Sequence, residues 1–66
     1  MKKTFREFYE LAKKLNRQRG GDDWNFDRDN RLDVTQGYGG VRLCWYDHAR
    51  GIYRRSYVRG AILIKP

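Results

Sequence analysis

Two segments of alternating residues, joined by a short polar loop, constrain this chain more than any other feature. Residues 41–46 alternate between Val, Leu and Trp on one side and Arg, Cys and Tyr on the other, the period-two pattern of a strand. Residues 47–51 read as a hairpin loop, with Gly51 where a positive φ is needed. Residues 52–58 supply the returning strand, so the sequence predicts a β-hairpin at the centre of the fold.

The N-terminal segment predicts a helix over about residues 5–18. Thr4 and Glu7 fit the capping-box pattern, in which a Thr cap is followed three residues later by Glu. An apolar stripe at helical spacing follows, formed by Phe5, Phe8, Ala12 and Leu15. Gly20 and Gly21 are a strong helix stop.

Residues 20–31 are expected to form an acidic loop. Within this segment the alternation of residues 24–26 could form a short strand, and residues 27–30 read as a turn. The acidic residues are interpreted as a solvated group that pairs with the basic end of the helix.

The rest of the chain predicts further strands. Residues 32–35 alternate again, residues 36–40 break the pattern with glycines, and residues 61–64 continue the sheet beyond Gly60. The predicted fold is therefore α+β: an N-terminal helix packed on a three- to four-stranded antiparallel β-meander over about residues 32–64. Residues 1–66 are expected to form a single small domain.

The charge indicates the kind of partner. The formal net charge is +7, and ten of the fifteen cationic residues are Arg, which suits phosphate recognition and stacking. The charge is divided along the sequence as +5 over residues 1–20, −3 over residues 21–36 and +5 over residues 37–66. This balance favours nucleic acid, a nucleic-acid-containing complex or an acidic protein surface as partner.

Cysteine usage and hydropathy indicate the compartment. Cys44 is the sole cysteine, so no internal disulfide can form, which favours a reducing compartment. No segment approaches the roughly 20 apolar residues of a membrane span, and the first residues lack the apolar core of a signal peptide. We expect a cytoplasmic protein that has no membrane partner.

The register of the hairpin decides which residues share a face. If a four-residue loop pairs Asp47 with Ile52, one solvent-facing side carries Arg42, Tyr46, Tyr53, Arg55, Tyr57 and Arg59. If the strand slips by one residue, Tyr53 and Tyr57 enter the core instead. We favour the first register.

This solvent-facing side predicts the leading function. Aromatic side chains stack on bases, and Arg binds phosphates. Lys13, Lys14, Arg17 and Arg19 on the helix could extend the same surface. The prediction is a small, basic, non-enzymatic nucleic-acid-binding protein that favours single strands or RNA.

No catalytic, metal or cofactor site is predicted. Residues 27–32 begin like a calcium loop, but Arg31 takes a ligand position and Leu32 stands where Gly is required. His48 and Cys44 are each the sole residue of their type, so they make no zinc site. No nucleophile with a base and an orienting group can be assembled.

Residues 36–43 are similar to the RNP motif of RNA-recognition domains. The matching positions are Gly37, Tyr38, Gly39 and Val41. The departures fall at the basic residue and at the aromatic positions that stack on bases, and the predicted fold has too few helices for that domain. We interpret this segment as a glycine-rich turn.

The chain as a whole resembles small proteins encoded by bacteriophages and prophages. The residues that carry the resemblance are Tyr38, Gly39, Gly40, Val41, Arg42 and Leu43, together with the single cysteine and the capped helix. The resemblance implies an alternative function: an inhibitor of a host or defence complex, like anti-CRISPR proteins, that acts in the host cytoplasm by protein or ribonucleoprotein binding. Trp24 and Phe26 are the candidate protein-contact anchors, although the interpretation that they cap the core is favoured. A homodimer that pairs through a sheet edge is a further alternative.

Overall fold

The computed structural model describes residues 1–65; Pro66, the last residue of the predicted domain, lies outside the described residues. In chain order the elements are β1 (Lys2–Thr4), α1 (Phe5–Gln18), α2 (Asp23–Asp29), β2 (Asp33–Gly37), β3 (Gly40–Asp47), β4 (Ile52–Arg59) and β5 (Ile62–Ile64).

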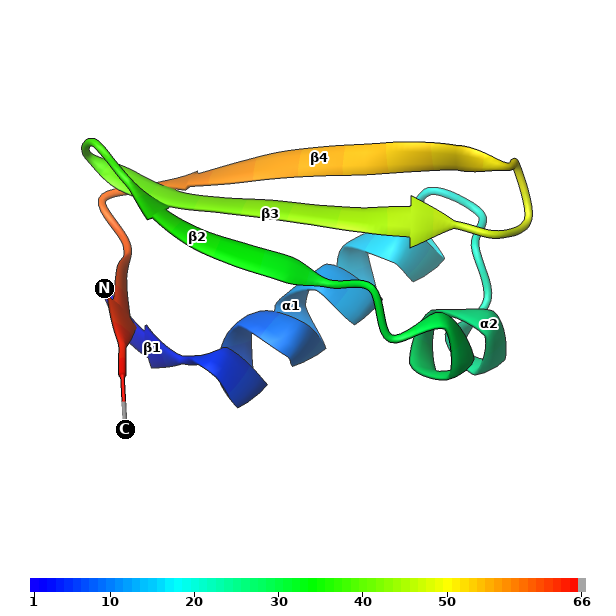
Figure 1. Cartoon of the computed structure of the whole chain (residues 1–66), viewed down its shortest axis with the longest axis horizontal. Coiled ribbons are helices and arrows are strands. Elements are labelled where there is room, and N and C mark those ends of the chain that lie inside the picture. Colours follow the sequence, from blue (N-terminus) through cyan, green and yellow to red (C-terminus); the bar gives the residue numbers. More distant parts are fainter. Residues whose placement is uncertain (66) are drawn as a thin grey trace.

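The elements form two layers (Figure 1). Strands β2, β3 and β4 make an antiparallel sheet in that order, and β1 and β5 make a separate parallel pair near one end of it. Both helices lie on the same side of the three-stranded sheet, and no helix or strand of residues 1–65 lies over its other side. The predicted α+β class, with a helix and a meander, is confirmed.

Helix α1 spans the predicted residues and begins as the sequence indicates. The hydroxyl of Thr4 accepts a hydrogen bond from the Glu7 N–H at 3.2 Å, and the Glu7 carboxylate accepts one from the Thr4 N–H at 3.0 Å. This reciprocal capping box satisfies two backbone donors at the start of the helix.

The core lies between α1, α2 and β3. Its buried members are Phe8, Tyr9 and Ala12 of α1, Phe26 of α2, Val41, Leu43 and Trp45 of β3, and Ala61. The Trp45 indole donates to the side-chain oxygen of Asn16 at 3.0 Å, and the Asn16 amide donates to the Asp22 carbonyl at 3.3 Å. Because buried polar groups need partners, this chain of bonds joins the sheet to the segment between the helices.

The secondary-structure predictions for residues 20–31 are wrong: the segment contains helix α2 in place of a strand, a turn and a loop. Asp22 caps α2, since its carboxylate accepts from the Asn25 N–H at 2.6 Å. Asn30 ends it in the left-handed conformation, with φ at 46°. The alternation of Trp24 and Phe26 reflects one residue that faces solvent and one that faces the core, which a single helical turn also produces.

The prediction that residues 61–64 continue the meander is also wrong. Gly60 turns the chain at a φ of 77°, and β5 then pairs in parallel with β1, a strand that the sequence did not predict. Gln36 of β2 holds β5 near the sheet: its amide donates to the Ala61 carbonyl at 3.2 Å, and its oxygen accepts from the Leu63 N–H at 2.7 Å. The antiparallel meander therefore has the three strands β2, β3 and β4.

The favoured hairpin register is confirmed, since Asp47 of β3 pairs with Ile52 of β4. Asp47 is only 1% exposed and is the centre of the loop contacts. Its carbonyl accepts from the Gly51 N–H at 2.8 Å, and its carboxylate accepts from the Arg50 N–H at 3.3 Å and from the Arg54 guanidinium at 3.2 Å. These bonds fix a loop of four residues between the paired ends.

We predict that Asp47→Asn lowers the free energy of unfolding by about 2–4 kcal/mol, because it breaks a buried, charged hydrogen bond at constant side-chain volume. Urea denaturation followed by circular dichroism would measure the loss. Asp33→Asn is the matched control, since Asp33 is exposed on β2 and its substitution should change stability by about 0.5 kcal/mol or less. Equal effects of the two variants would contradict the role of Asp47.

Candidate nucleic-acid interface

The uncovered side of the three-stranded sheet is called the outer face here. Antiparallel partners point to the same side, so the observed register places on it Asp33 and Thr35 of β2, Arg42, Cys44 and Tyr46 of β3, and Tyr53, Arg55, Tyr57 and Arg59 of β4. Tyr53 is 68% exposed and Tyr57 is 51% exposed. The six residues that the sequence assigned to a sheet surface are thus brought together.

An aromatic group lies at the hairpin-loop end of the outer face. The rings of Tyr46 and Tyr53 meet edge to face, with centroids 5.1 Å apart. The guanidinium of Arg31 lies over the Tyr46 ring at 5.1 Å and donates to the Tyr53 hydroxyl at 3.4 Å. Sequence reasoning missed Arg31 because it placed that residue in an acidic loop, whereas the left-handed end of α2 turns the chain toward the sheet.

Tyr57 is held at the opposite end of the outer face. Its hydroxyl donates to the Tyr38 carbonyl in the β2–β3 turn at 2.8 Å. Its ring lies across Gly40, where an added Cβ would come within 2.8 Å of the ring carbon Cζ. Gly40 therefore provides the space in which the Tyr57 ring rests on the sheet.

The outer face carries a strong excess of positive charge. Within residues 1–65, Arg42, Arg55 and Arg59 form no ion pair. The acidic member of the face is Asp33, whose carboxylate accepts from the Thr35 hydroxyl at 3.2 Å. Three guanidinium groups thus remain available for an anionic ligand.

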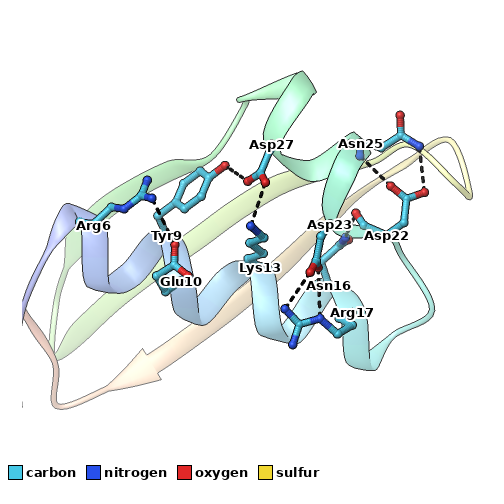
Figure 2. Close-up of polar contacts among 10 residues, drawn as sticks. All are labelled: Arg6, Tyr9, Glu10, Lys13, Asn16, Arg17, Asp22, Asp23, Asn25 and Asp27. Carbon is cyan, nitrogen blue, oxygen red and sulfur yellow. Dashed lines mark hydrogen bonds and ion pairs between the residues drawn. The ribbon is translucent and has the colours of Figure 1, made fainter.

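The helix cations do not extend this face as one group. Lys13 donates to Asp27 at 2.8 Å, and Arg17 makes two hydrogen bonds to Asp23, at 3.1 and 2.9 Å (Figure 2). Lys14 is exposed on α1 and belongs to the helix layer. Two of the four predicted extensions are therefore already neutralised by carboxylates of α2.

Arg19 is the helix cation that reaches the sheet. Its guanidinium lies 5.6 Å from the centre of the Trp45 ring and donates to the Arg55 carbonyl at 3.5 Å. Arg19 therefore lies at the β4 edge, beside the outer face.

The carboxylates between the helices alter the acid–base properties of their partners (Figure 2). The hydrogen bond from Lys13, and then the one from the Tyr9 hydroxyl, hold the pKa of Asp27 below its usual range. Burial, and then the hydrogen bond to Asp27, raise the pKa of Tyr9 to about 12. These groups belong to the helix side of the molecule and stabilise the packing of α2 on α1.

The two candidate protein-contact anchors both lie on α2, one buried and one exposed. Phe26 is 4% exposed and lies in the core, so it cannot serve as a contact anchor. Trp24 is 67% exposed, and the guanidinium of Arg28 lies over its ring at 4.7 Å. Only Trp24 is therefore available to a partner.

Residues 1–65 contain no group of three His, Cys, Asp or Glu side chains that could hold a metal ion. No helix in this part of the chain is long and apolar enough to cross a membrane.

Comparisons of this chain with protein-family models, with curated proteins and with solved structures found no significant match.

We predict that stability falls as the pH rises from about 10 to about 12. The pKa of Tyr9 is about 12 in the folded state and near 10 in the unfolded state, so the unfolded state loses the Tyr9 proton first as the pH rises. The contribution of the Tyr9 hydroxyl to stability is therefore complete below pH 10 and is lost as the pH rises toward 12. Tyr9→Phe should flatten the decline, measured by urea denaturation across this range. Asp27→Asn should flatten the decline only in part, because burial, the larger cause of the raised Tyr9 pKa, remains. An unchanged decline in Tyr9→Phe would contradict the assignment.

Proposed function

We propose that this protein is a non-enzymatic nucleic-acid-binding protein that holds single-stranded RNA or DNA against the outer face. One observation carries the proposal: exposed tyrosines share an uncovered sheet face with arginines that form no ion pair within residues 1–65. Each tyrosine ring can stack on a base, and each guanidinium can bind a phosphate.

Single strands fit this face better than duplexes do. A base can lie on an aromatic ring only when it is not paired and stacked within a helix, and stacking contributes about 1–3 kcal/mol per base. Tyr53 and Tyr57 stand four residues apart on the same side of β4, which spaces their Cα atoms by about 13 Å along an extended strand. A flexible single strand can adapt to that spacing.

The distribution of charge supports the same partner. Asp23 and Asp27 are paired with cations of α1, and Asp47 is buried with Arg54. The net charge of +7 is therefore expressed mainly by groups outside these pairs, including the arginines of the outer face. Such a field attracts a polyanion and increases its rate of association.

We predict that a fluorescently labelled oligonucleotide binds with a strong salt dependence. If three arginines each neutralise one phosphate, the plot of log K against log salt has a slope of about −2. Tyr53→Ala and Tyr57→Ala should each weaken binding by about 5- to 150-fold, the equivalent of one lost stack, and Arg55→Ala should make the slope less steep. Tyr53→Phe should bind almost as the parent does, because it keeps the ring.

Lys14→Ala is the matched control for charge, since Lys14 is exposed in the helix layer. It should change affinity less than Arg55→Ala does. Absence of binding at low salt, or binding that none of the outer-face variants alters, would contradict the proposal.

A second candidate function is inhibition of a host or defence complex, in the manner of anti-CRISPR proteins. The resemblance to phage-encoded proteins suggests it, and the exposed Trp24 favours it, because Trp and Arg dominate protein-contact hot spots. A net charge of +7 makes the chain a poor mimic of DNA, so such an inhibitor would bind an acidic surface or the nucleic acid of the complex.

A pull-down from bacterial lysate, with and without nuclease treatment, separates the two functions. We predict that nuclease releases the captured material and that Arg55→Ala reduces its amount. A protein partner that is retained after nuclease, and that Trp24→Ala releases, would favour the inhibitor.

A further inference from the structure

Aromatic and cationic side chains continue beyond the outer face, around the hairpin-loop end of the sheet. His48 lies in the β3–β4 loop, with its ring 6.1 Å from that of Tyr46. A guanidinium nitrogen of Arg28 lies 3.4 Å from both His48 ring nitrogens, and the same guanidinium covers the Trp24 ring. We call Trp24, Arg28 and His48 the side strip.

The fold places the side strip next to the outer face. Helix α2 and the β3–β4 loop lie at the same end of the molecule (Figure 1). Arg28 of α2 and His48 of the loop join these two segments, and Tyr46 of β3 continues the series onto the sheet. A path therefore runs from Tyr57 through Tyr53 and Tyr46 to Trp24 across two sides of the molecule.

The carboxylates of α2 do not close this path to an anion. Asp23 and Asp27 are paired with cations of α1, and Asp22 accepts hydrogen bonds at the start of the helix. Asp29 lies 3.6 Å from both Arg28 and His48, with one oxygen buried and without a hydrogen-bond partner among residues 1–65. Each negative charge near Trp24 is thus offset locally or engaged by the helix.

We propose that a bound single strand continues from the outer face around the hairpin loop and stacks a further base on Trp24. This inference rests on the proposed function and extends its site to the side strip. One face of the Trp24 ring is covered by Arg28, while 67% of the residue stays exposed. The Arg28 guanidinium, which also lies 3.6 Å from Asp29, supports the ring from one side and leaves the exposed side for a base.

The distribution of the aromatic residues over several elements favours a nucleic acid over a protein as the occupant. Protein hot spots gather in one compact, desolvated cluster. Here Tyr46 and Trp24 each carry their own guanidinium, from Arg31 and Arg28, and lie on different elements. A repeated pair of one ring and one cation matches the repeat of base and phosphate along a strand.

The two tryptophans make the inference directly measurable. Trp24 is 67% exposed, whereas Trp45 is 1% exposed in the core. Quenching of tryptophan emission by a stacked base therefore reports on Trp24. The probes are oligo-dT strands of about 4 and about 12 nucleotides, a short and a longer length within the range of site sizes that single-strand-binding domains show.

We predict that the longer strand quenches the emission and the shorter one, bound on the outer face, quenches it much less. Trp24→Ala should weaken binding of the longer oligonucleotide by about 5- to 150-fold, leave binding of the shorter one nearly unchanged and abolish the quenching. Trp24→Phe should retain most of the affinity. Tyr57→Ala should weaken binding of both oligonucleotides.

The outcomes separate this inference from the proposed function. If Tyr57→Ala weakens binding of both oligonucleotides while Trp24→Ala weakens binding of neither, the side strip is not part of the site and the proposed function stands. If neither strand binds at low salt, both proposals fail. If Trp24→Ala alters only the capture of a nuclease-resistant protein, Trp24 belongs to a protein contact and the inference is overturned.

Discussion

The buried carboxylate of Asp47 is the constraint on which the exposed surface depends. It accepts hydrogen bonds from the Arg50 N–H and the Arg54 guanidinium at the end of β3, and so holds a four-residue loop. Side chains alternate along a strand, so a shift of one residue in β4 would move Tyr53 and Tyr57 into the core. The character of the outer face is thus decided at the loop end, by a residue that solvent scarcely reaches.

The packing of the two helices explains where the remaining charge lies. Helix α2 brings Asp23 and Asp27 onto Arg17 and Lys13 of α1, so a basic segment and an acidic segment neutralise each other behind the sheet. Such partly exposed pairs contribute little stability individually, on the order of 0–1 kcal/mol. Their larger effect is to keep these carboxylates on the helix side, so that Arg42, Arg55 and Arg59 form no ion pair within residues 1–65, as an anion-binding face requires.

Local signals in the sequence predicted α1, the hairpin and its register, because the capping box, the alternation and the loop length act over a few residues. The remaining features depend on tertiary contacts. Helix α2 forms where Asp22 caps it and where Phe26 can enter the core, neither of which the spacing of residues 24–26 reveals. The outer-face residues were therefore predictable as a group. The contact of Arg31 with Tyr46 was not, because it follows from the end of α2.

The parallel pairing of β1 with β5 joins the two most distant parts of the described chain. The Met1 amino group lies 3.4 Å from the Gly60 carbonyl, 59 residues away in sequence. Closing so long a loop is entropically costly, and contacts of high sequence separation form late in folding. The β3–β4 hairpin closes a loop of four residues, whereas β1 pairs with a strand close to the other end of the described chain. The outer face, which belongs to β2, β3 and β4, therefore depends on much shorter chain closures than the β1–β5 pair does.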